Sequence, residues 1–341
     1  MIRVTTNGTL RTYRSNLARA TLHQAQAMNT VLTRRRFNSF AESPSLATQS
    51  YRVHASYARN QAQQKTSETV ISKFEAAFSS LQALNDQYRT ALAAAESGQN
   101  GDKDSTALNA IGETLTGIAE GMVQTLNGKY GEKFIFSGAD GLEVPFELKD
   151  GELYFRGLAV DDPANADAFR EMMGETTYVD IGLGFELDEN EQVIPSTAFN
   201  SAISGIGLVG FGTTDGTADG VPNNMISIIS ELGEIYKRAS GDNGLTGADA
   251  ERAEELFGNL QNAFDSYNTN ATELDTRAQF LKSNDKRLVA TGDTLWEQSE
   301  GLDRVDLADA LTTFAYAQYS YNAALRVGND ILSQSFIDFM R

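Results

Sequence analysis

The stretch ISKFEAAFSSLQALNDQYRTAL, residues 71–92, shows most clearly how this chain folds. Mostly apolar residues recur in it at alternating steps of three and four: Ile71, Phe74, Phe78, Leu81, Asn85, Tyr88 and Leu92. Such heptad spacing lines one face of a long helix with side chains that pack against a partner helix. After a polar loop, Leu108, Ile111, Leu115, Ile118 and Met122 repeat the pattern, and Asp104 or Ser105 is the expected N-cap of that helix.

The same spacing extends toward both ends of the sequence. One stripe consists of Thr6, Leu10, Tyr13, Leu17, Ala20, Gln24, Ala27 and Val31, and another of Leu307, Leu311, Phe314, Gln318, Tyr321, Leu325, Gly328 and Leu332. Because these outer stripes are partly polar or very small, each helix alone is marginal in water. We expect the ends either to form an ordinary intramolecular core or to become ordered by packing against copies of the chain.

The middle of the chain has a different composition. Residues 129–222 hold 14 of the 29 glycines and four of the five prolines, and the apolar period shortens to two. Asp150-Gly151 between two apolar runs is a strong hairpin signal, and Asp188–Glu191 indicates a second turn. The sequence predicts a mainly α protein with a β-rich insert. Residues 1–139 and 223–341 form an antiparallel long-helix bundle, and residues 140–222 form a small β domain at its tip.

Charge is distributed unevenly along the chain. The net charge is -18, yet residues 1–60 contain nine Arg, no Lys and one acid, Glu42. The acidic majority argues against nucleic acid or an anionic membrane as the main partner. The basic arm is expected either to be a solvated face or to pack on acidic surface of the same chain or its neighbours.

Few residues are suited to catalysis or to binding a cofactor. The absence of Cys excludes disulfides and thiol nucleophiles, and His23 and His54 are the only histidines. Gly205–Gly210 matches a dinucleotide motif, but a loop follows it where a helix is needed. A secreted carbohydrate hydrolase would need a cleft with two acids about 5–9 Å apart, for which the insert is short. We therefore expect no enzyme, no catalytic residue, no cofactor and no metal.

Three stretches resemble the flagellin family. Arg36, Phe37 and Asn38, followed by Ala41-Glu-Ser-Pro44, stand where family members have an Arg-Ile/Phe-Asn turn and an acidic segment. Residues 307–339 resemble the family's terminal helix. The segment that contains Tyr130, Phe134, Phe136, Ser137 and Gly138 is similar to one typical of family members at the hook–filament junction.

The resemblance implies a structural part of the bacterial flagellum, located between hook and filament outside the cell. Its implied partners are copies of itself, another hook-associated protein, flagellin and an export chaperone, and its export requires no cleaved signal peptide. A filament-forming flagellin is the nearest alternative. Under this reading, the expected assembly interface consists of Leu10, Tyr13, Leu17, Leu325, Leu332, Phe336, Ile337 and Phe339, since an apolar cluster in a helical end needs a partner.

Overall fold

The computed structural model describes residues 6–99, 103–239, 245 and 247–339. The chain divides into two compact units, which we describe separately. Unit 1 comprises residues 1–61 and 289–341, and unit 2 comprises residues 62–288. Two long helices, α2 (Pro44–Gln99) and α7 (Ala248–Asp303), contribute residues to both units. No helix among the described residues is both long and apolar enough to cross a bilayer.

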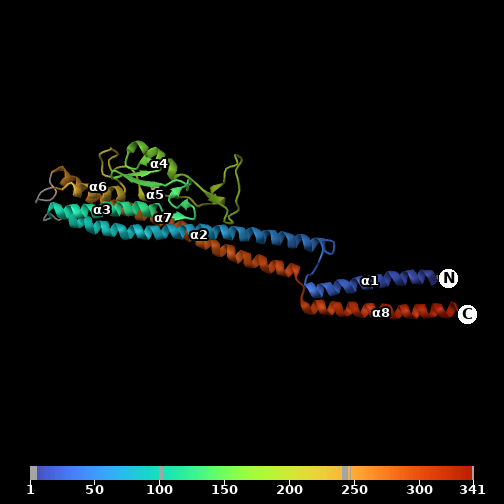
Figure 1. Cartoon of the computed structure of the whole chain (residues 1–341). Coiled ribbons are helices and arrows are strands. Elements are labelled where there is room, and N and C mark those ends of the chain that lie inside the picture. Colours follow the sequence, from blue (N-terminus) through green and yellow to red (C-terminus); the bar gives the residue numbers. More distant parts are fainter. Residues whose placement is uncertain (1–5, 100–102, 240–244, 246, 340–341) are drawn as a thin grey trace. The chain divides into compact units, whose positions relative to one another are not determined.

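The described residues of unit 1 form helices and the turns that join them. Helix α1 (Thr6–Thr33) lies antiparallel beside α8 (Leu307–Phe339), with both chain ends at the same end of this pair (Figure 1). The beginning of α2 and the end of α7 form the remainder of the unit. Tyr57 and Trp296 pack there with ring centroids 5.7 Å apart.

Unit 2 contains the main hydrophobic core. Phe74, Leu81 and Tyr88 of the predicted stripe are buried, whereas its other four members are half-buried. Ala77, Leu84 and Ala91 complete the buried face of α2 in unit 2. Tyr88 stacks there on Phe264 of α7 with ring centroids 3.6 Å apart. The hydroxyl of Tyr267 donates a hydrogen bond of 3.1 Å to the Leu81 carbonyl, which satisfies a polar atom inside this core. Helix α3 (Ser105–Leu126) begins as predicted, because Asp104 accepts the Ala107 N–H.

Helix α3 packs closely on α6 (Met225–Lys237) because glycines meet where they cross. A Cβ added at Gly112 would lie 2.6 Å from the Gly233 carbonyl oxygen and 2.8 Å from the Lys237 nitrogen. Both of these atoms belong to the α6 backbone, which has little freedom to move. The crossing therefore depends on the missing side chain at Gly112.

The β-rich segment of unit 2 has short strands in four small antiparallel sheets. The sheets are β1 (Lys129–Tyr130) with β2 (Lys133–Phe134), β3 (Ser137–Gly138) with β9 (Ile203–Ser204), β4 (Phe146–Lys149) with β5 (Glu152–Phe155) and β6 (Leu158–Ala159), and β7 (Tyr178–Val179) with β8 (Phe199–Asn200). Two short helices, α4 (Ala166–Met173) and α5 (Gly205–Val209), complete the segment.

Both predicted turns are confirmed. Asp150 and Gly151 join β4 to β5 with φ angles of 52° and 87°, the left-handed pair that a two-residue hairpin requires. At the second turn the Asp188 N–H donates to the Gln192 carbonyl at 2.8 Å. The fold class is therefore confirmed as mainly helical with a small β-rich insert. The division into segments 1–139, 140–222 and 223–341 stays a prediction.

The structure also shows how the insert is attached to the helices of unit 2. Lys73 donates to the Ser201 carbonyl at 2.9 Å, and Asn284 donates to the Ile181 carbonyl at 2.8 Å. One guanidinium nitrogen of Arg277 donates to the carbonyls of Asn200 and Ala202. The insert thus lies along α2 and α7 in unit 2, held through its backbone carbonyls.

The α3–α6 crossing gives a direct test of the packing in unit 2. We predict that Gly112→Ala lowers the free energy of unfolding by about 1–2 kcal/mol, since overpacking outweighs the gain in helix propensity. Gly117→Ala is the matched control on the same helix, because a Cβ there meets nothing within 4 Å. It should stabilise the chain by up to about 1 kcal/mol. Urea denaturation followed by circular dichroism measures both changes, and equal effects would contradict the close crossing.

Candidate assembly surface

The inner face of α1 follows the predicted stripe. Leu10, Tyr13, Leu17 and Val31 are half-buried and Ala27 is buried, whereas most other described residues of α1 are exposed. This face is the one that α8 covers. The α1 part of the expected interface is therefore in use within the chain, and its role between copies stays a prediction.

The inner face of α8 differs from the expected stripe. It consists mainly of small residues: Ala310, Ala317, Ala324 and Gly328 alternate with Phe314 and Tyr321. Phe314, Tyr321 and Gly328 lie on this face as expected. The other described members of the expected stripe are exposed: Leu307, Leu311, Gln318 and Leu325. We call the pairing of this face with the α1 stripe the α1–α8 seam.

Small residues occupy the α1–α8 seam because they allow the two helices to approach each other closely. Tyr13 lies directly across Gly328, where an added Cβ would be only 1.9 Å from the Tyr13 hydroxyl oxygen. A face with leucines at these positions would push α1 away and lose this contact. The larger side chains of α8 therefore point elsewhere, and the seam buries little apolar surface.

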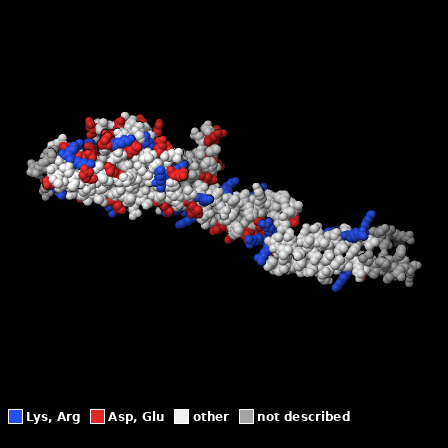
Figure 2. Space-filling model, in the orientation of Figure 1, with Lys and Arg blue, Asp and Glu red and all other residues white. Residues whose placement is uncertain are grey.

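Outside this seam, the paired helices expose a long uncharged surface. Neither Ala20–Thr33 on α1 nor Ala310–Leu325 on α8 contains a charged residue. Figure 2 shows this pair as a nearly white surface with a few blue side chains. The exposed large apolar residues of the pair are Leu22, Met28 and Leu32 on α1 and Leu307, Leu311, Tyr316, Tyr319, Leu325 and Val327 on α8.

The large apolar side chains on this surface are so exposed that their exposure requires an explanation. Tyr316 and Tyr319 keep 71% and 75% of their surface accessible, and Leu32 keeps 71%. Single exposed apolar residues are common in monomers, but a contiguous group marks a site of interaction. His23 and Tyr316 also line an open hollow of about 440 Å³ between the two helices. We therefore treat the outer faces of α1 and α8 as the candidate assembly surface.

Four residues of the expected interface lie beyond this surface. Leu332, Phe336, Ile337 and Phe339 belong to α8, but they fall outside the residues whose side chains the structure describes. Their expected role in assembly stays a prediction.

A backbone clasp holds the turn between α1 and α2 against the junction of α7 and α8. The Arg36 N–H donates to the Asp303 carbonyl at 2.7 Å, and the Val305 N–H donates to the Arg34 carbonyl at 3.1 Å. Arg34 has a φ of 56°, the left-handed conformation that commonly ends a helix, and it directly follows α1. Of the motif residues there, Phe37 is half-buried, whereas Arg36 and Asn38 are exposed, and the Asn38 N–H donates to the Glu42 carboxylate at 2.7 Å.

The side chain of Asp303 connects this clasp to α2. Ser50 donates to Asp303 Oδ1 at 2.5 Å, and His54 Nε2 lies 2.6 Å from Asp303 Oδ2. Partial burial alone would raise the pKa of Asp303, but the hydrogen bonds from Ser50 and His54 and the charge of Arg35 lower it below its usual value. We call Ser50, His54 and Asp303 the Asp303 cluster.

The Asp303 cluster could not be recognised from the sequence. His54 has no acidic partner nearby in the chain, because Asp303 lies 249 residues further along. One signal was present: Ser50 and His54 are four residues apart, so they share one face of a helix. Only the pairing of α2 with α7 shows which acid they meet.

The junction-like motif of the middle segment forms the base of the insert. Phe136 and Ser137 are buried, and the Phe136 carbonyl accepts the Gly205 N–H at 2.8 Å. Gly138 has a φ of 79°, where its missing side chain permits the turn out of β3. Phe134 is buried as well and Tyr130 is half-buried, and both belong to the β1–β2 pair. Ser137 and Gly138 pair with residues 203–204 through β3 and β9.

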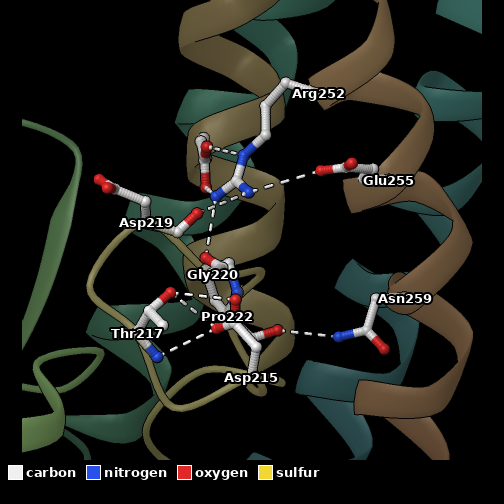
Figure 3. A network of polar contacts seen from close by, with 9 residues as sticks. Asp215, Thr217, Asp219, Gly220, Pro222, Arg252, Glu255 and Asn259 are labelled. Carbon is white, nitrogen blue, oxygen red and sulfur yellow. Dashed lines mark hydrogen bonds and ion pairs between the residues drawn. The ribbon is translucent and has the colours of Figure 1, made fainter.

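The acidic hollow beside the insert is built from structural contacts. It has a volume of about 820 Å³, and Arg252 reaches across its rim (Figure 3) to bind Glu231 at 2.7 Å and the carbonyls of Asp219 and Gly220. Burial raises the pKa of Asp161 in this hollow to about 6, and Asn224 donates to its carboxylate. These contacts tie the loop before α6 to α7.

No group of three or more His, Asp and Glu side chains among the described residues is placed to hold a metal ion. The Gly205–Gly210 motif forms the short helix α5, capped by Ser204. Gly205 lies against the Phe146 ring, 2.5 Å from where a Cβ would stand, so its glycine serves packing.

Comparison with known proteins supports the fold. No protein-family model matches the sequence, and no curated protein matches it either. A solved structure of a protein assigned to the flagellar hook-associated proteins of Vibrio parahaemolyticus is 13% identical and has a TM-score of 0.57, over 77% of this chain and 100% of that one. The sequence-based resemblance is therefore confirmed at the level of the fold.

Two further solved structures are more distant. FlgL of Bacillus cereus is 16% identical with a TM-score of 0.46, over 73% of this chain and 99% of its own. The flagellar junction protein FlgL of Legionella pneumophila is 10% identical with a TM-score of 0.45, over 69% of this chain and 99% of its own.

The lowered pKa of Asp303 makes the stability of unit 1 depend on pH. A carboxylate with a lowered pKa stabilises the fold above its unfolded pKa, about 3.9, and this contribution is lost as the pH falls through the folded value. We predict that Asp303→Asn destabilises unit 1 at pH 7 by at least about 1 kcal/mol, because this is the usual net contribution of one hydrogen bond and charged groups contribute more. Below pH 3 the variant and the original chain should converge.

Trp296 provides the readout, because it is the only tryptophan and lies in unit 1. Urea unfolding followed by its fluorescence at pH 7 and pH 2 measures the difference. Asp293→Asn, which changes an exposed carboxylate on the same helix, is the control and should have little effect at either pH. A constant difference between Asp303→Asn and the original chain at both pH values would show that the carboxylate charge is not responsible.

Proposed function

We propose that this chain is a structural component of the bacterial flagellum that forms the junction layer between hook and filament, the role of hook-associated protein 3. The observation that carries the proposal is the row of exposed large apolar residues on α1 and α8, with no charge in residues 20–33 and 310–325, on a chain with this fold. A hook-associated fold explains why both ends of the chain pair with each other and yet leave large apolar residues exposed.

Assembly in this proposal follows from burial of the exposed faces of α1 and α8. Full burial of one large apolar side chain gains about 1.5–3 kcal/mol. Burying about half of the nine exposed residues would then gain on the order of 10 kcal/mol per subunit, before the entropy of ordering is subtracted. This gain is large enough to drive packing into a layer and to fix helices that are marginal alone.

The proposal assigns a passive, non-catalytic role to the chain. Its partners are copies of itself, another hook-associated protein on the hook side and flagellin on the other, and an export chaperone would keep it unassembled in the cell. It is exported without a cleaved signal peptide and functions outside the cell. The alternatives are a filament-forming flagellin and a secreted carbohydrate-active enzyme. No geometric observation favours either of them.

Electron microscopy of a strain that lacks this chain tests the proposal. We expect hooks without filaments and intact flagellin released into the medium, because filament subunits would have no layer on which to assemble. Hooks without filaments and without released flagellin would identify the chain as the filament subunit itself. Normal filaments would contradict both flagellar functions.

Complementation of that strain tests the candidate assembly surface. A chain with Leu311→Asp and Leu325→Asp should be exported but should not restore filaments, since both changes place charge on the exposed face of α8. Leu142→Asp is the matched control, because Leu142 is equally apolar and 75% exposed but lies on the insert of unit 2. Restoration of filaments by the α8 variant would show that this face is not an assembly contact.

A further inference from the structure

A second exposed apolar feature lies on unit 2, and it carries a strong charge. Residues 184–192 form a projecting hairpin in which every residue is exposed. The hairpin contains four acids, Glu186, Asp188, Glu189 and Glu191, and no basic residue. It also exposes Phe185 and Leu187, which keep 42% and 52% of their surface accessible.

This acidic hairpin is well ordered by its own hydrogen bonds. The Ile194 N–H donates to the Glu186 carbonyl at 3.1 Å, and Leu187 forms a β-bridge with Val193. At its tip, the Asp188 carboxylate accepts the N–H groups of Asn190 and Gln192. The hairpin therefore presents its apolar and acidic side chains from a defined backbone, which lowers the entropy cost of binding.

Unit 1 has a surface of the opposite character. An open groove of about 520 Å³ is lined by Gln49, Arg52, Val53, Gln298, Gly301 and Leu302, with Val53 and Leu302 as its apolar part. Arg34, Arg35 and Arg36 are exposed in the adjoining turn, where the Arg36 N–H binds the carbonyl of Asp303, the residue after Leu302. We call this surface the basic groove.

The charges of the two units support a contact between the hairpin and the groove. Unit 1 contains twelve Arg and nine acidic residues, which leaves a net charge of +3 and gives unit 2 a net charge of -21. Opposite potentials steer surfaces together and fix their register, and they suppress contacts between like surfaces. Two hairpins, or two unit 2 surfaces, would therefore repel each other.

We propose that the acidic hairpin of one copy docks into the basic groove of the next copy. Phe185 and Leu187 would cover Val53 and Leu302, while Glu186, Glu189 and Glu191 would face Arg34, Arg36 and Arg52. A contact of this kind joins two different surfaces, so its repetition generates a ring or a helix of copies. The inference deepens the proposed function, because it names the partner surface that sets neighbouring copies in register.

Mixed disulfide formation tests the contact directly in the purified full-length chain, which has no cysteine of its own. One variant carries Asn190→Cys at the tip of the hairpin, and a second, longer by an affinity tag, carries Gln49→Cys in the groove. Both substitutions keep every charge and every large apolar residue of the two surfaces. Since each variant has a single thiol, a mixed disulfide can form only between copies.

In the matched control, a variant that carries Glu143→Cys takes the place of the Asn190→Cys variant. Glu143 lies in another exposed loop of unit 2, between Leu142 and Val144, which are also exposed. We expect the Asn190→Cys and Gln49→Cys mixture to give about tenfold more mixed dimer than the control at low salt, and this excess should decrease at high salt as the charges are screened. An equal yield from the control would overturn the proposal.

Charge reversal shows which surfaces are responsible. Adding Glu186→Lys, Glu189→Lys and Glu191→Lys to the hairpin variant should remove the excess of mixed dimer. Combining this reversed hairpin variant with a groove variant that carries Arg34→Glu, Arg36→Glu and Arg52→Glu should restore the excess of mixed dimer. Circular dichroism shows whether each variant is folded, and failure of the paired reversal to restore cross-linking in folded variants would contradict the contact.

The outcome is independent of the strain experiment. Released flagellin and bare hooks in the strain that lacks this chain, together with no excess cross-linking, would leave the junction role standing and remove the hairpin contact. Normal filaments in that strain would remove the junction role, whatever the cross-linking shows.

Discussion

The packing of Tyr13 across Gly328 determines how the two ends of this chain are built. Because α1 and α8 approach each other through alanines, a glycine and a few half-buried aromatic residues, their seam buries little apolar surface. The exposed large side chains of α8, Leu307, Leu311, Tyr316, Tyr319, Leu325 and Val327, remain outside it, and residues 20–33 and 310–325 carry no charge. The pair therefore leaves large apolar side chains exposed.

The two units are stabilised in different ways. Unit 2 has stacked aromatics, a close helix crossing and an insert held by several hydrogen bonds to carbonyls, so it is stabilised within one chain. Unit 1 depends on a short backbone clasp and on the Asp303 cluster to hold its helices at their junctions. In the proposed function, a chain built this way travels as a monomer with marginal ends, which become ordered when it meets copies and neighbours.

Much of the fold was predictable from the sequence, because heptads and turn residues are local signals. The stripe of residues 71–92, the N-cap Asp104 and the hairpin at Asp150-Gly151 all follow from spacing or backbone chemistry. The face of α8 that packs on α1 was not predictable from the sequence. Its leucine-rich positions resemble a core, and only the partner helix α1 shows that Ala310, Ala317 and Ala324 fit better there. Asp303 was missed for the same reason: its partners lie about 250 residues away. A third hairpin, at Arg156-Gly157, lacked the usual Asn or Asp signal.

Amide hydrogen exchange in α1 and α8, measured in the free chain and in assembled flagella, tests the central claim most directly. The account predicts rapid exchange over residues 6–33 and 307–331 in the free chain, because the α1–α8 seam alone stabilises these helices weakly. After assembly the same amides should be strongly protected, whereas those around Leu81 and Tyr88 should be protected in both states. Equal protection of α1 and α8 before and after assembly would contradict the account.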